Sequence, residues 1–162
     1  METSNHATHK TQFARDAAFF VALLATALAL GGALAHALEL ANKIELSGAD
    51  YFIVQRIYFG WDRLGYLLGV ELAGMLSVIY LYRRERRVVR PTLLALSCLV
   101  GAQIVFWTFT FPANQATNNW SVQPENWEIL RRQWEYSHLA GAIFQMLAMA
   151  TLIVAVLRRS RL

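Results

Sequence analysis

Four long apolar stretches dominate the chain, and short polar segments separate them. The stretches run approximately over residues 17–40, 64–82, 92–111 and 136–157. A helix needs about 20 predominantly apolar residues to cross a bilayer, and each stretch is close to that length. Short connections place successive helices side by side in opposite directions. The pattern therefore predicts an all-α fold: one integral membrane domain, residues 1–162, built as an antiparallel four-helix transmembrane bundle.

The segment between the first two stretches has a helical pattern of its own. Its apolar residues recur at three- and four-residue steps: Ile53, Val54, Ile57, Tyr58 and Trp61. This spacing predicts an amphipathic helix over residues 51–59 that lies on the outer membrane interface. Asp50 is expected to cap the start of that helix.

Proline and polar residues indicate where the long helices begin and end. Pro91 is expected at the start of the third helix and Pro112 at its end, because proline suits a first helical turn and interrupts a helix interior. The fourth helix is expected to begin near Glu125. Residues 1–16 are polar and are expected to form a frayed or interfacial segment ahead of the first span.

Charge is distributed unevenly between the two sides of the predicted bundle. The net charge is +4, and ten of the fifteen Lys and Arg residues fall on the side that holds both termini and the turn over residues 83–90. Basic residues favour the cytoplasmic side of a membrane. We therefore expect both termini in the cytoplasm, with a bacterial inner membrane as the location. The Arg-rich turn is then expected to set the orientation of the protein in the membrane and to contact lipid headgroups. We therefore expect the bilayer as a partner and no binding of nucleic acid.

Ionisable residues interrupt three of the apolar stretches. Glu71 lies inside the second stretch, while His36 and Glu39 close the first and Glu135 and His138 open the last. Each His/Glu pair is three residues apart, which places both side chains on one helical face. Charged groups at membrane depth are costly and usually functional. Their estimated depths are similar, so we expect all five residues to line one pocket in the outer half of the bundle and to be its catalytic residues.

The same five residues suggest a metal site. Glu-x-x-His pairs with a further carboxylate are typical of dinuclear sites in four-helix bundles. Imidazole and carboxylate groups suit iron, copper, manganese or zinc. The predicted metal ligands are His36, Glu39, Glu71, Glu135 and His138.

Three other interpretations of these residues stay open. His36 and His138 could be the axial ligands of a b-type haem. Alternatively no cofactor is bound, and one histidine acts as a general base while Lys43, Arg131 or Arg132 stabilises an anion. Finally, the groups could be structural ion pairs, as expected for Arg131 with Glu135 at a four-residue spacing.

Other polar and aromatic residues are candidates for substrate binding. Gln103, Asn114 and Arg131 are expected to orient the substrate. Trp127 and Trp134 are seven residues apart, so they share a helical face and could border a pocket for a flat aromatic molecule. Anchoring at the membrane interface is the simpler role for these tryptophans. A glycine at position 74 is expected to allow close helix packing.

Two stretches resemble a known family. Residues 111–120, FPANQATNNW, and residues 126–138, NWEILRRQWEYSH, are similar to the C-terminal signature of the anthrone oxygenase-like family, and residues 36–43 with 51–58 resemble its bacterial branch. The resemblance implies a small four-span membrane protein that oxidises polyketide anthrones to anthraquinones with molecular oxygen. Asn114, Trp134 and His138 match the family pattern. The basic residue expected one turn after His138 is absent.

These observations together predict a membrane-embedded oxidoreductase or oxygenase. Its substrate would be a hydrophobic small molecule of quinone-like or polyphenolic type. The alternative is a non-enzymatic protein, a small transporter or a lipid- or partner-binding protein, that uses the same polar pocket. A homo-oligomer is one option for its assembly.

Overall fold

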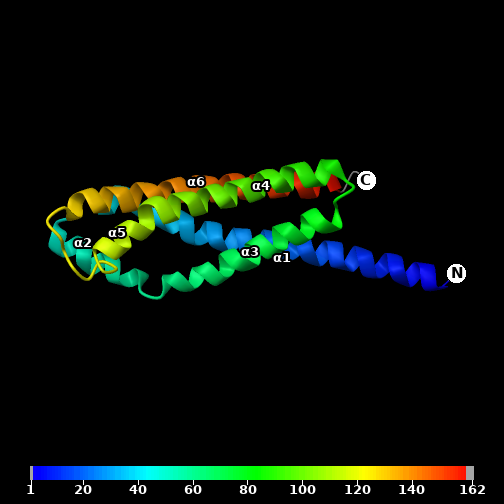
Figure 1. Cartoon of the computed structure of the whole chain (residues 1–162), viewed down its shortest axis with the longest axis horizontal. Helices are drawn as coiled ribbons and strands as arrows, with labels where there is room; N and C mark the ends of the chain where they lie inside the picture. The colour runs from blue at the N-terminus through cyan, green and yellow to red at the C-terminus, as the bar shows by residue number, and fades with distance from the viewer. Residues whose placement is uncertain (1, 160–162) are drawn as a thin grey trace.

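Most of the part of the chain that the structure describes is helical. The computed structural model describes residues 2–159, with side chains from residue 9 onward, and contains no strand in that range (Figure 1). The elements are α1 (Glu2–Lys43), α2 (Gly48–Val54), η1 (Gln55–Tyr58), η2 (Trp61–Arg63), α3 (Leu64–Leu81), α4 (Arg86–Val105), η3 (Phe106–Thr110), α5 (Phe111–Ala116) and α6 (Trp127–Arg159). The all-α prediction is confirmed.

Four helical stretches are long and apolar enough to cross a membrane. They are His9–Lys43, Trp61–Leu81, Arg86–Ala116 and Trp127–Arg159. Large apolar side chains such as Phe20 and Ile104 are well exposed on their outer faces, whereas many of the fully buried positions are alanines. Small residues inside and large apolar residues outside are typical of helices packed within lipid. The prediction of four apolar spans is therefore confirmed.

Each long helix packs against at least two of the others. α1 packs against α3 and α6, and α4 packs against α6 and, less closely, against α3. A Cβ atom added at Gly74 of α3 would lie 2.9 Å from the backbone of Ala22 in α1. Only glycine permits that approach, so the expected close packing at Gly74 is confirmed.

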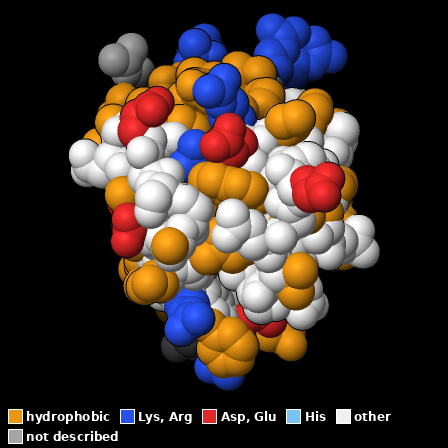
Figure 2. All heavy atoms as spheres, turned by 90° about the vertical axis from the view of Figure 1, so that its left-hand side faces the viewer, with side chains coloured by type: hydrophobic (Ala, Val, Ile, Leu, Met, Phe, Trp, Pro, Cys, Tyr) orange, Lys and Arg blue, Asp and Glu red, His pale blue; other side chains and the backbone are white. Residues whose placement is uncertain are grey.

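The molecule has two distinct ends. One end, called here the cap end, is formed by residues 44–63 and 111–126, and the other, the terminal end, holds both termini and the α3–α4 turn (Figure 1). Seen from outside, the cap end carries acidic and basic side chains scattered among apolar and neutral ones (Figure 2). The many arginines of residues 83–90 and 158–159 lie at the terminal end.

The first and third long helices begin earlier than predicted. Residues 2–16 form the first turns of α1 instead of a separate segment, because neither proline nor glycine occurs before Gly31 to end the helix. α4 begins at Arg86, so Pro91 lies five residues inside the helix and not at its start.

Pro112 does not end the third span. In the wide turn η3 the Phe111 N–H bonds to the Phe106 carbonyl, five residues back. This extra residue in the turn lets α5 start at Phe111, and Pro112 then occupies a first-turn position, where a missing N–H costs little. The helix consequently continues to Ala116.

The segment between the first two spans is helical, but it forms short helices and not the one continuous helix predicted. The predicted helix over residues 51–59 is divided between α2 and η1, and its N-cap is Ser47, not Asp50. Asp50 is the third residue of the helix, and its backbone amide donates a hydrogen bond of 3.2 Å to the Ser47 hydroxyl. Gly60 follows with φ of +87°, a value that favours glycine, and turns the chain into η2.

Candidate functional site

The polar residues of the helices form two clusters and not the single pocket expected. Leu64, the first residue of α3, lies opposite Gly32 of α1, one turn before His36. Glu71 is seven residues further along α3, about 10 Å closer to the terminal end. Because α3 begins only after the cap residues 44–63, at the level of Gly32, Glu71 does not reach the level of His36.

The first cluster, called the cap-end cluster, is centred on two histidines that come from α1 and α6. The rings of His36 and His138 are stacked with centroids 4.1 Å apart and an angle of 26° between their planes. Trp134 lies 4.1 Å from His138 and Tyr58 lies 4.4 Å from His36, measured between ring centroids. His36 is buried, and its Nδ1 atom has no hydrogen-bond partner in the described part of the chain.

This arrangement does not fit the expected cofactors. Axial ligation of a haem needs two imidazole nitrogens that point at one iron from opposite sides, whereas these rings meet face to face. Within residues 9–159, no group of three or more His, Cys, Asp and Glu side chains is placed to hold a metal ion.

Lys43 is the central charged residue of the cap-end cluster. Its side chain is buried, and Nζ lies 2.7 Å from the Tyr58 hydroxyl, 3.2 Å from Glu135 and 3.5 Å from Glu39. The ammonium group also lies 4.8 Å from the centre of the Trp134 ring. Two carboxylates and an aromatic face together offset the cost of burying this cation.

Glu135 does not form the predicted pair with Arg131. Its partners are Lys43 and the hydroxyl of Tyr51, which donates a hydrogen bond of 2.9 Å. Arg131 instead donates to the Leu46 carbonyl at 2.6 Å and stacks on Trp127 at 4.7 Å. The guanidinium therefore holds the chain after α1 in place, and the carboxylate is free to pair with Lys43.

Two tyrosines of the cap connect the charged groups. Tyr58 accepts a hydrogen bond from Lys43 and donates one to Glu39, and Tyr51 accepts from Gln55 and donates to Glu135. Burial and the neighbouring carboxylates raise the pKa of both tyrosines above its usual range. Both phenols therefore stay neutral and act as hydrogen-bond donors.

Asn114 holds two tryptophans in place with one oxygen atom. Its Oδ1 accepts from Trp134 Nε1 at 2.9 Å and from Trp120 Nε1 at 3.1 Å. Three consecutive residues, 118–120, have φ between 47° and 61°, an unusual conformation for a tryptophan. Burial of the Trp120 ring against Tyr51 and Trp134 offsets that strain. Asn114 thus fixes the position of Trp134 beside His138.

The second cluster, called the mid-helix cluster, surrounds Glu71. The side chain of Glu71 is fully buried and accepts hydrogen bonds from Thr26 at 2.9 Å and from Gln145 at 3.2 Å. No Lys, Arg or His among the described residues forms an ion pair with it. Glu71 joins α1, α3 and α6 through neutral partners only.

The predicted site residues divide accordingly. His36, Glu39, Glu135, His138 and Trp134 meet in the cap-end cluster. Asn114, Arg131 and Trp127 lie just around it and position its members. Glu71 belongs to the mid-helix cluster, and half-buried Gln103 takes part in none of the hydrogen bonds of either cluster.

Sequence reasoning missed several members of the two clusters. Lys43 is predicted only as one of three cations that could stabilise an anion. No site role is predicted for the other members: Tyr51, Gln55, Tyr58, Trp61, Thr26 and Gln145. A usable signal was present for the cap, because Tyr51, Gln55 and Tyr58 recur at steps of four and three residues and share a helical face. Gln145 also had a signal, because it lies seven residues after His138 and continues the polar stripe of that helix. Thr26 had none, since it is an ordinary residue within an apolar helix.

Comparisons with protein-family models, curated protein sequences and solved structures found no match. The resemblance to the anthrone oxygenase-like family therefore stays a prediction that rests on the residues quoted above.

Proposed function

We propose that this protein is an integral membrane oxidoreductase that acts on a hydrophobic aromatic molecule in the cap-end cluster. The observation that carries the proposal is the stacked pair of buried His36 and half-buried His138 beside Lys43 and Tyr58, with aromatic rings around it. Such a site combines a base, a cation and flat apolar walls, which suit a quinone-like or polyphenolic substrate.

A membrane orientation accompanies this proposal. The four spans form an antiparallel bundle in a bacterial inner membrane, with the arginine-rich terminal end in the cytoplasm. The cap end then faces outward, and residues 44–63 lie at the interface. The exposed side chains of Ile53, Ile57 and Phe59 support contact of this segment with lipid.

The first step would be removal of a proton from carbon. With its proton on Nε2, His36 has a free lone pair on Nδ1 and acts as a general base towards a methylene group conjugated with an aromatic ketone. The Lys43 ammonium group and the Tyr58 hydroxyl stabilise the negative oxygen of the resulting enolate. Tyr58 also connects Lys43 to Glu39, whose side chain is 37% exposed and gives the proton a route to water.

The oxidant implied by the family resemblance is molecular oxygen. In the complete reaction the methylene loses two hydrogens and gains one oxygen atom to become a ketone. The second oxygen atom leaves as water, so one O2 is consumed for each ketone formed. The protein contributes the proton transfer and the stabilisation of the enolate.

The proposal is tested with the full chain in lipid nanodiscs and unsubstituted 9(10H)-anthracenone as the probe. Oxygen uptake and the absorbance of anthraquinone are followed above the uncatalysed background. We expect His36→Ala to lower kcat on the order of 10²- to 10⁴-fold, the usual contribution of a general base. His9→Ala, which removes an exposed histidine from the same helix, is the matched control and should leave kcat unchanged.

Two results would contradict the enzyme proposal. Equal rates for the wild type and His36→Ala would exclude His36 as the base. Binding of the probe without any oxygen uptake above background would favour the non-enzymatic alternative, a carrier or binding protein.

A further inference from the structure

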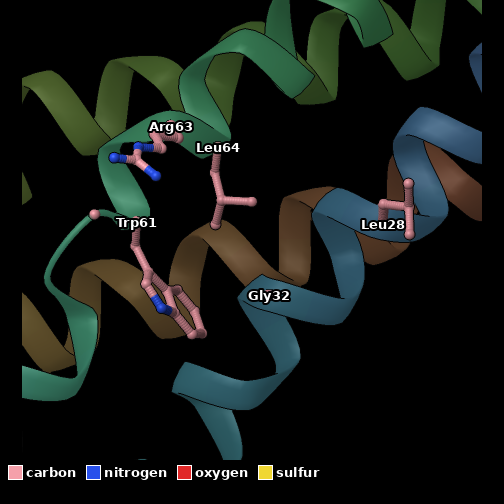
Figure 3. Close-up of a pocket in the computed structure, with 6 residues that line it drawn as sticks. Leu28, Gly32, Trp61, Arg63 and Leu64 are labelled. Carbon is pink, nitrogen blue, oxygen red and sulfur yellow. The ribbon is translucent and has the colours of Figure 1, made fainter.

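A groove lies beside the cap-end cluster, between α1 and the start of α3. It has a volume of 310 Å³ and is lined by the residues listed here: Leu28, Gly32, Gly60, Trp61, Arg63 and Leu64. The indole of Trp61 and the side chain of Leu64 both extend towards α1 at Gly32 (Figure 3). An apolar cavity of about 150 Å³ suffices for benzene, so this groove has room for more than one aromatic ring.

Trp61 separates this groove from the histidine pair. Its ring lines the groove and also lies 5.1 Å from His36 and 5.2 Å from Tyr58, between ring centroids. Gly60, with its positive φ, makes the turn that brings Trp61 back against α1. A molecule in the groove would therefore be one side chain away from His36.

The groove opens on a surface that lies within two of the apolar spans. Leu28 is 55% exposed and Leu64 is 38% exposed, and both belong to helices apolar enough to cross a membrane. In a bilayer these two side chains face lipid, while Gly60 and Arg63 form the part of the groove at the interface. An apolar molecule dissolved in the membrane can then reach the groove without passing through water.

We propose that the substrate enters the cap-end cluster sideways from the bilayer through this groove, and that Trp61 controls its passage and its shape. The occupant is the flat aromatic substrate of the proposed function, on which this inference rests. A flat ring can slide along the indole of Trp61, whereas a molecule with twisted rings cannot.

Photolabelling tests the entrance without requiring turnover. The probe is an anthraquinone with a diazirine on its ring, added to the full chain in nanodiscs and mapped by mass spectrometry. We expect labels on Leu28, Trp61 or Leu64, competed by excess 9(10H)-anthracenone. Labels confined to other lipid-facing residues, or labels on the groove that anthracenone does not compete, as for an ordinary lipid site, would overturn the proposal.

A matched pair of glycine variants tests the same entrance in kinetics. Gly32→Phe places a ring in the groove and should raise KM for anthracenone about tenfold, with kcat little changed. A small loss of apolar contact between a substrate and its pocket changes binding by about this factor. Gly31→Phe is the control, because nothing lies within 4 Å of a Cβ atom there. An equal KM in both variants would overturn the entrance, while the His36→Ala result would still stand for the chemistry.

The role of Trp61 is tested by substrate shape. Deoxybenzoin has a methylene next to a ketone, but its two rings rotate freely. The preference in kcat/KM for anthracenone over deoxybenzoin should fall about tenfold in Trp61→Ala and be retained in Trp61→Phe. An unchanged preference in Trp61→Ala would show that Trp61 is not a specificity residue.

Discussion

Lys43 and Glu71 are both buried ionisable residues, but Lys43 has oppositely charged partners and Glu71 has only neutral ones. Lys43 has two carboxylates and two aromatic rings around its ammonium group. Glu71 has only the hydroxyl of Thr26 and the amide of Gln145. A buried charge without a counter-ion is costly, whereas one held by opposite charges and hydrogen bonds is tolerated. The cap-end cluster is therefore suited to reactions that create charge, and the mid-helix cluster is suited to joining helices.

Substitution of Glu71 tests that distinction. Glu71→Leu has a side chain of similar size but leaves the Thr26 and Gln145 donors unpaired. It should lower the free energy of unfolding by about 2–6 kcal/mol, since each of the two buried unpaired groups costs about 1–3 kcal/mol. Glu71→Gln retains an acceptor and should be as stable as the wild type or more so. Thermal unfolding in detergent measures both, and equal losses in the two variants would contradict this account.

At the scale of the helices, glycine and proline determine how closely the elements pack and where they change direction. Gly74 lets α3 touch the backbone of α1, and Gly60 turns the cap back towards α1. Pro112 is accommodated by the wide turn η3, which carries the third span on to Ala116. The same continuation brings Asn114 to the level of Trp134.

Gly74→Leu should separate α1 from α3. The new side chain would have to displace the Ala22 backbone, and overpacking of this kind costs about 1–3 kcal/mol or more. Gly69→Leu on the same helix is the control, because a Cβ atom there has no neighbour within 4 Å. A lower melting temperature is expected for Gly74→Leu alone, and similar values for the two variants would refute the close contact.

At the scale of the whole molecule, charge and apolar surface together set the proposed orientation. The arginines of the α3–α4 turn and of the end of α6 lie at the terminal end, while the cap end mixes both signs (Figure 2). A positive end favours the cytoplasm. The cap-end cluster and the groove would then lie in the outer half of the membrane.

Cysteine labelling in intact cells tests this orientation. Cys98 is the only cysteine and is buried, so Cys98→Ala gives a suitable background. Asn118→Cys at the cap end should react with a membrane-impermeant maleimide from outside. Arg84→Cys at the terminal end should react only after the cells are permeabilised. The reverse pattern of labelling would place the cap end in the cytoplasm.

Part of the candidate site was predictable from spacing along the chain. His36 with Glu39 and Glu135 with His138 each share a helical face, and the structure brings the two pairs together. Lys43 was visible as one turn after Glu39, yet nothing in the sequence distinguished it from Arg131 or Arg132. The predicted level of Glu71 is wrong, because the depth of a residue in a bundle depends on where its helix starts relative to the neighbouring helices.

The sequence by itself determined the helical class, the four apolar spans and the uneven distribution of arginine, because these depend on composition and on periodicity within one segment. The tertiary structure decided which buried groups meet. The 44–63 segment folds over the ends of α1 and α6, and it brings Tyr58 and Trp61 to His36 and Tyr51 to Glu135. Contacts between residues far apart in the chain depend on the relative shift of whole helices, which no local pattern records.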